Sequence, residues 1–180
     1  YKVYFHIIGD FFSPREREEY MSIIKENHLA PYVILHGRQA GQMLDLLFEL
    51  CDFGIGSLGR HRSGITNIKT LKNREYAARG IPFIYSEIDE DFENMPYIMK
   101  IPANEEAVDI KQILNFYNQL HITPLEIRNS IRHLSWNNQM KKVLDEMQKK
   151  DKINPNNNNI ANFATLYTNK FIPNKEKWPH

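Results

Sequence analysis

Two neighbouring segments of the chain carry the residue types that hold a phosphorylated ligand. The first, Ser57–Gly64 (SLGRHRSG), combines flexible glycines with two arginines and a histidine. The second, Leu71–Tyr85, predicts a short basic helix that ends at a glycine, followed by a proline and an apolar strand. Phosphates are bound by backbone N–H groups and by positive charge, so we expect this region to bind a nucleotide diphosphate. The three basic residues of the first segment are Arg60, His61 and Arg62.

The predicted helix adds two candidate contacts to such a ligand. Lys72, near its start, can reach a phosphate as a point charge. Glu75 offers a carboxylate that accepts a hydrogen bond from a ribose hydroxyl, but it also lies four residues before Arg79, which is the spacing of a surface ion pair. The residues alone leave both interpretations of Glu75 open. Arg74 is expected to face solvent or to pair with the acidic residues 87–93.

The loop after the second predicted strand is another candidate binding element. Gly37 and Arg38 lie where a nucleotide base can rest against main-chain groups, and a plain connecting loop is the equal alternative. His36, at the strand end, is better placed for a ligand contact than His6, which lies within an apolar strand and is expected in the core. No set of His, Cys, Asp and Glu residues has a convincing metal-ligand spacing, so neither a metal nor a cofactor is expected.

Composition and charge narrow the class of protein. The formal net charge of +1 provides no global basic field, which argues against a non-specific nucleic-acid binder. Charge is polarised locally, because residues 57–80 are basic and residues 87–93 carry five carboxylates. The single cysteine, Cys51, excludes an internal disulfide and fits a reducing, cytoplasmic setting. No apolar run approaches the roughly 20 residues of a membrane-spanning helix.

Five apolar runs predict β-strands, and helical patterns separate them. Ser13 and Pro14 form a helix start, and Glu16 completes a capping box. Strands that alternate with single helices predict a parallel sheet whose ligand crevice lies beyond the carboxyl ends of the strands. We therefore expect an α/β fold with a Rossmann-like parallel sheet flanked by helices. The predicted strands are Lys2–Ile8, Tyr32–Leu35, Asp52–Ser57, Phe83–Tyr85 and Tyr97–Ile101.

After Pro102 the pattern is helical only. The apolar faces of these C-terminal helices, which include Trp136, are expected to belong to the core. The polar run Asn154–Asn159 predicts an exposed loop, after which an amphipathic pattern predicts a last helix that docks back. The predicted helices cover residues 108–120, a segment beginning at Thr123, residues 135–149 and residues 160–171.

The ends of the chain define its expected domain organisation. The sequence begins at Tyr1, in a strand-like run and without an initiator Met, which indicates a fragment of a longer protein. We expect residues 1–150 to form one Rossmann-like domain that binds a nucleotide-containing ligand. Residues 151–180 are expected to form the Asn-rich loop and a tail that docks onto it.

One set of motifs spans most of the chain before the Asn-rich loop. It comprises Gly54–Gly59, Leu71–Lys72, Arg74–Tyr76, Ala78–Phe83, and Leu134–Trp136 followed by Met140 and Leu144. The set resembles glycosyltransferases of the group 1 type, and more narrowly the carboxyl-terminal, donor-binding domain of a GT-B-fold sugar transferase.

This resemblance implies roles for individual residues. Glu75 corresponds to the second glutamate of the family's paired-glutamate motif, which binds the ribose hydroxyls of the donor. The first glutamate falls at Asn67, where an amide can still bond to a hydroxyl but carries no charge. The first turn also departs from the family's Gly-Asp-Gly pattern, because Phe11 follows Asp10 here. Such enzymes normally work without a metal.

The function expected from the resemblance is transfer of a sugar from a nucleotide diphosphate sugar to an acceptor hydroxyl. The fragment is expected to bind the donor without turnover, because the N-terminal acceptor domain lies outside it, and any membrane contact would come through that domain. A nucleotide-sugar epimerase of the same fold and a non-enzymatic module that binds an acidic partner are the alternatives. No catalytic residue is predicted. The candidate donor-binding residues are Glu75, Arg60, His61, Arg62, Lys72, Gly64, Asn67, Gly37 and Arg38.

Overall fold

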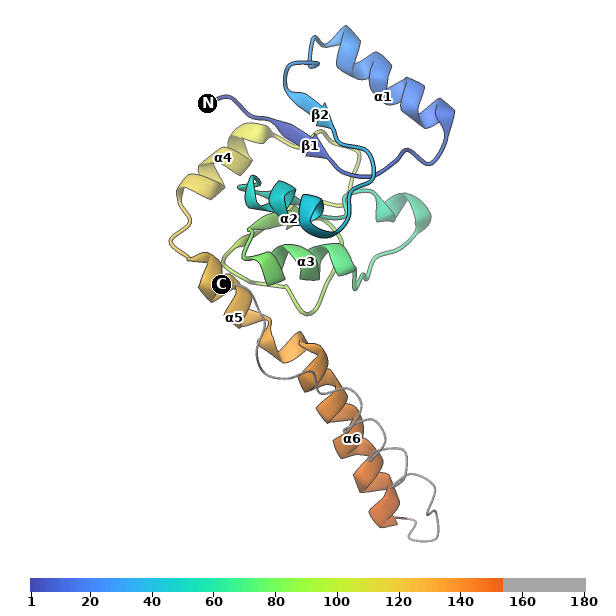
Figure 1. Cartoon of the computed structure of the whole chain (residues 1–180), viewed down its shortest axis with the longest axis vertical. Helices are drawn as coiled ribbons and strands as arrows, with labels where there is room; N and C mark the ends of the chain where they lie inside the picture. The colour runs from blue at the N-terminus through green and yellow to red at the C-terminus, as the bar shows by residue number, and fades with distance from the viewer. Residues whose placement is uncertain (154–180) are drawn as a thin grey trace. The chain divides into compact units, whose positions relative to one another are not determined.

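The computed structural model describes residues 1–153, with side chains to residue 149. It is an α/β protein in which parallel strands form small sheets flanked by helices, with further helices at the C-terminal end (Figure 1). The chain divides into two compact units after Gly54, a boundary that lies inside the range 1–150 expected to form one domain. The predicted fold class is thus confirmed.

The first unit contains a two-stranded parallel sheet and two helices. In the sheet, His6 lies opposite Ile34. The first helix begins at the predicted residues, because the Ser13 hydroxyl accepts a hydrogen bond from the Glu16 N–H at 3.1 Å and Pro14 is the first helical residue. The predicted capping box is only half formed, since the Glu16 carboxylate accepts the N–H of Phe12 at 2.6 Å and not that of Ser13. The elements in chain order are β1 (Phe5–Ile7), α1 (Pro14–Glu26), β2 (Val33–Leu35) and α2 (Gly41–Glu49).

A three-stranded sheet with β4 at its centre organises the second unit. β4 is buried at all three of its positions, as a central strand covered on both faces requires. Its parallel partner β5 places Ile98 opposite Phe83. The strands are β3 (Gly54–Ile55), β4 (Phe83–Tyr85) and β5 (Ile98–Lys100). The helices are η1 (Arg60–Ser63), α3 (Leu71–Arg79), α4 (Ile110–Asn118), α5 (Pro124–Ser130), η2 (Arg132–Leu134) and α6 (Trp136–Ile153).

The structure changes the predicted strands in two ways. The strands belong to two sheets, β1–β2 and β3–β4–β5, whereas the sequence pattern led us to expect one. β3 is shorter than the predicted Asp52–Ser57, although pairing continues past its end: the Gly56 N–H donates to the Ile84 carbonyl at 2.7 Å. Beyond that point, the Ser86 N–H donates to the Ser57 carbonyl at 3.1 Å, so the two segments run parallel past the end of β3.

The core of the second unit is an aromatic cluster around Phe83. Its ring centroid lies 5.4 Å from that of Phe92, in an edge-to-face arrangement, and 5.7 Å from that of Tyr76. Tyr85 and Tyr97 complete the cluster at 6.0 and 6.3 Å. Aromatic pairs at these distances add to the stability provided by burial alone.

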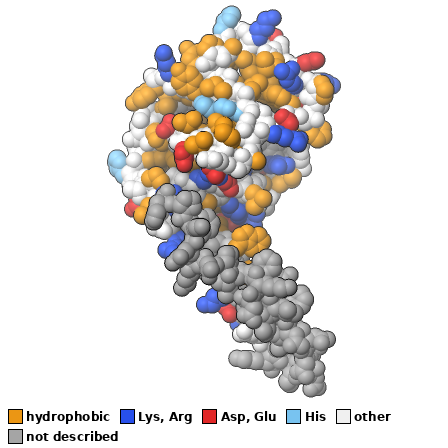
Figure 2. Space-filling view, in the orientation of Figure 1, with side chains coloured by type: hydrophobic (Ala, Val, Ile, Leu, Met, Phe, Trp, Pro, Cys, Tyr) orange, Lys and Arg blue, Asp and Glu red, His pale blue; other side chains and the backbone are white. Residues whose placement is uncertain are grey.

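The expectation that the apolar faces of the C-terminal helices are core holds only in part. Ile113 and Ile127 are buried, but Trp136 is 83% exposed. Hydrophobic side chains are visible among charged ones on the face of the molecule shown in Figure 2. The predicted loop 154–159 and helix 160–171 lie outside the described residues. α6 extends to Ile153, so the boundary expected at residue 150 falls within this helix.

Gly80 ends α3 in a conformation that a side chain would not tolerate. Its φ is +76°, and an added Cβ would lie 2.6 Å from the Pro124 carbonyl oxygen and 2.7 Å from the Pro124 Cβ. We predict that Gly80→Ala lowers the free energy of unfolding by about 3 kcal/mol, measured by urea titration. Gly64→Ala is the matched control, because φ is +68° there but nothing lies within 4 Å of the added Cβ. That control should cost only about 1 kcal/mol, and equal losses would contradict a clash with Pro124.

Candidate functional site

The basic loop predicted from the sequence connects β3 to α3 within the second unit. Gly64 closes η1 in the left-handed conformation and donates its N–H to the His61 carbonyl at 2.9 Å. The chain then pairs with the segment after β4, where the Ile68 N–H donates to the Ile88 carbonyl at 2.8 Å. The hydroxyl of Thr70 caps α3. These contacts bring the basic loop, the start of α3 and the segment after β4 together.

Arg60 is fixed through its backbone. Its N–H donates to Glu87 Oε1 at 2.7 Å, and Glu87 is only 2% exposed. The ammonium group of Lys100 in turn donates to the Glu87 carbonyl at 2.5 Å. A buried carboxylate on a backbone N–H is an effective anchor, because breaking the bond would leave both groups without a partner. Glu87 was missed as a positioning residue, although its place directly after the central strand was a usable signal.

Arg60 and Lys72 form a pair of neighbouring cations. Partial burial and the positive charge of Arg60 lower the pKa of Lys72. Within the described part of the chain, neither side chain forms an ion pair with a carboxylate. Lys72 is the second residue of α3, where the helix dipole adds further positive potential. This corner of the second unit therefore favours an anion.

The other two basic residues of the loop have an intramolecular partner that the sequence did not indicate. His61 Nε2 lies 2.8 Å from Glu105 Oε1, and Arg62 Nε donates to the same oxygen at 2.8 Å. A second guanidinium N–H of Arg62 reaches Glu105 Oε2. Hydrogen bonds from Arg62 and His61 lower the pKa of Glu105 to about 2. Because Glu105 lies in a coil more than 40 residues further along the chain, no local pattern points to it.

Glu75 and Asn67, the two predicted ribose contacts, are both on the surface. Glu75 Oε1 accepts a hydrogen bond from Arg79 Nε at 2.6 Å, so the surface ion pair anticipated from the spacing is present. The Glu75 side chain is still 47% exposed. Asn67 takes part in a parallel bridge with Ile88, and its side-chain amide donates to the Thr66 hydroxyl at 3.1 Å.

The acidic segment after β4 is held by cations of its own unit. Arg74 donates to Asp89 at 3.1 Å and also pairs with Asp91, so of the two outcomes expected for Arg74 it pairs with the acidic segment. Asp89 is fully buried and accepts a second hydrogen bond from the Asn73 amide at 3.1 Å. Asp89 and Asp91 are therefore part of the structural framework that attaches α3 to the segment after β4.

Glu93 is a second junction of this framework. Its Oε1 accepts hydrogen bonds from the Tyr85 hydroxyl at 2.8 Å, the Lys100 ammonium at 2.5 Å and the Asp89 N–H at 3.1 Å. Although burial opposes it, these hydrogen bonds lower the pKa of Glu93. Burial, with the hydrogen bond to Glu93, raises the pKa of Tyr85. The carboxylate therefore stays ionised at neutral pH and holds β4, β5 and the acidic segment together.

The remaining candidates belong to the first unit. The Gly37 carbonyl accepts a hydrogen bond from the Gly9 N–H at 2.8 Å, and Arg38 pairs with Asp10 at 2.6 Å. Nδ1 of His6 lies 3.0 Å from Nε2 of His36, and the two rings stack. The two histidines therefore contact each other.

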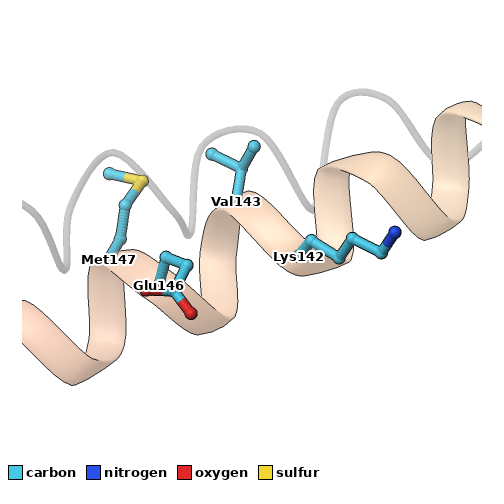
Figure 3. Close-up of a pocket in the computed structure, with 4 residues that line it drawn as sticks. All are labelled: Lys142, Val143, Glu146 and Met147. Atoms are coloured by element: carbon cyan, nitrogen blue, oxygen red, sulfur yellow. The ribbon is translucent and has the colours of Figure 1, made fainter. Parts of the chain in front are cut away.

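A metal cluster, a membrane-spanning helix or a surface pocket among the described residues could also indicate a function. Within the described residues, no group of three or more His, Cys, Asp or Glu side chains is arranged to hold a metal ion. The same part of the chain contains no helix that is long and apolar enough to span a membrane. A surface pocket lies along one face of α6 (Figure 3), but it shares no residue with the basic loop. Its lining residues are Lys142, Val143, Glu146 and Met147.

No protein-family model, curated protein or solved structure matches the chain, so the fold and the geometry of the basic loop are the findings from which its function is inferred.

Proposed function

We propose that the chain is the donor-binding domain of a glycosyltransferase, acting in the cytoplasm, and that it binds a nucleotide diphosphate sugar between η1 and the start of α3. The observation that carries the proposal is the Arg60–Lys72 pair. Two neighbouring cations that have no carboxylate partner among the described residues raise the energy of the protein, and an anion that bridges them removes the repulsion. A diphosphate has the charge to do so, and the N-terminal N–H groups of α3 supply further donors.

Glu75 supports a nucleotide as the ligand in preference to free phosphate. It lies three residues after Lys72, so both side chains lie on the same face of α3. Its exposed carboxylate can exchange the Arg79 contact for a ribose hydroxyl, because a surface ion pair contributes little to stability. In the proposed reaction the basic side chains stabilise the charge that develops on the departing diphosphate. The acceptor is then bound by a separate domain.

Calorimetric titration with UDP, GDP, their sugars and inorganic pyrophosphate tests this proposal. We expect Lys72→Ala to weaken diphosphate binding by roughly tenfold, because it removes a charged contact. Lys69→Ala is the matched control. It removes the same charge just before α3, from a side chain that pairs with Glu90 at 3.6 Å, and should leave the affinity within about twofold. If no nucleotide binds the folded protein, the donor-site proposal is wrong and an interaction module becomes the better interpretation.

Glu75→Ala separates ribose binding from phosphate binding. The variant should bind UDP or GDP several-fold more weakly and bind pyrophosphate as the unchanged protein does, because only the nucleotides carry a ribose. Circular dichroism should show an unchanged fold, since the lost ion pair is on the surface. If the variant binds the nucleotides as tightly as the unchanged protein does, Glu75 does not bind the ribose and its contact with Arg79 is its role.

A further inference from the structure

We infer that His61 and Arg62 form a second oxyanion-binding site, and that the carboxylate of Glu105 competes with phosphoryl oxygens of the ligand for it. The inference rests on the proposed function in one respect, that the ligand carries a diphosphate. Below, the pair is called the His61–Arg62 site.

The geometry of the contact is that of an oxyanion site. Three N–H donors converge on the two oxygens of Glu105: Nε2 of His61, Nε of Arg62 and a terminal nitrogen of Arg62. The planar guanidinium fork binds carboxylates and phosphates in the same two-pronged way. The two Glu105 oxygens therefore stand in for two oxygens of a phosphoryl group.

The Glu105 carboxylate is easy to displace. Its side chain is 60% exposed and sits in the irregular segment between β5 and α4. Exposed ion pairs change an equilibrium by only a few-fold, because water and salt compete for both partners. By contrast, a diphosphate brings at least two negative charges, so it can exchange with the single carboxylate.

The His61–Arg62 site is continuous with the Arg60–Lys72 pair. Arg60 directly precedes His61 in η1, so the two cation sets lie on one turn of chain. One phosphoryl group can then neutralise Arg60 and Lys72, while the other displaces Glu105. Its contacts lower the pKa of Glu105 to about 2, so Glu105 is ionised at neutral pH and competes with the ligand there.

Titration of the full chain with inorganic pyrophosphate tests the inference. We expect Glu105→Gln to bind pyrophosphate roughly two- to fivefold more tightly, the range for removing an exposed competing ion pair. Glu106→Gln is the matched control, because it removes the same charge from the adjacent residue, whose side chain is exposed and makes no ion pair within the described residues. Its affinity should equal that of the unchanged protein. The gain should disappear at 1 M salt and in the double variant Arg62→Gln, Glu105→Gln.

The outcomes separate this inference from the proposed function. If the unchanged protein binds pyrophosphate and Glu105→Gln binds it no more tightly, competition by Glu105 is wrong while the donor site stands. If Glu105→Gln gains affinity for pyrophosphate but no nucleotide binds any variant, the His61–Arg62 site stands and the donor function fails. An equal gain in Glu106→Gln, or no pyrophosphate binding by any variant, would overturn the inference.

Discussion

Replacing Asp89 by alanine is expected to lower the free energy of unfolding of the second unit by about 3–5 kcal/mol, the range for removing one partner of a buried ion pair. Asp89 is fully buried and binds both Arg74 and the Asn73 amide. The alanine variant leaves that amide without its acceptor and removes one of the two carboxylates that neutralise Arg74. Since α3 is attached to the segment after β4 through these bonds, its first turns should also lose protection against hydrogen exchange.

Asp91→Ala is the matched control for Asp89. It removes the same charge from the same arginine, but the Asp91 side chain is partly exposed, so water can replace it. The expected loss is about 1 kcal/mol or less. Urea titrations of both variants measure the difference, and hydrogen exchange of the α3 amides assigns it to this junction. Similar losses in the two variants would show that burial of Asp89 does not matter.

Phe83→Ala is expected to lower the free energy of unfolding by about 4 kcal/mol, because it removes a large buried side chain and leaves a cavity. Phe83 is fully buried in the central strand and contacts four aromatic rings. Loss of these ring contacts adds to the cost of the lost apolar area. The cavity cannot close easily, since the strand is held on both sides by β3 and β5.

Leu71→Ala tests whether burial is the cause of that loss. Leu71 is of similar apolar character but is largely exposed at the start of α3, and alanine is a better helix former. The free energy of unfolding should change by no more than about 0.5 kcal/mol. Urea titration followed by circular dichroism measures both variants. A loss below about 2 kcal/mol in Phe83→Ala would show that the cluster repacks around the missing ring.

The two framework carboxylates also affect the proposed site. Asp89 and Asp91 neutralise Arg74, so the positive charge of Arg74 is used inside the protein. The charge available to an anion lies instead at Arg60 and Lys72, with Arg62 and His61 shared with Glu105. The basic segment predicted from the sequence thus offers less positive charge to a ligand than its composition indicates. Any binding measurement on it therefore needs the single-residue controls described above.

Features of short range were predictable from the sequence. The start of α1 at Ser13 and Pro14, the end of α3 at Gly80 and the ion pair of Glu75 with Arg79 depend on residues within four positions of each other. Likewise, the buried strand Phe83–Tyr85 follows from its own apolar residues. These features are local, so the amino-acid types and their spacing are sufficient to identify them.

Other features were decided only by the tertiary structure. Strand pairing uses backbone groups that all residues share, so the sequence identified strands but not their division into two sheets. The burial of Asp89, the exposure of Trp136 and the contact of Glu105 with His61 and Arg62 depend on segments far apart in the chain. By itself the sequence determined an α/β fold with a cationic loop before α3. Which cations of that loop have a carboxylate partner among the described residues was decided by long-range charge pairing, which only the folded chain brings about.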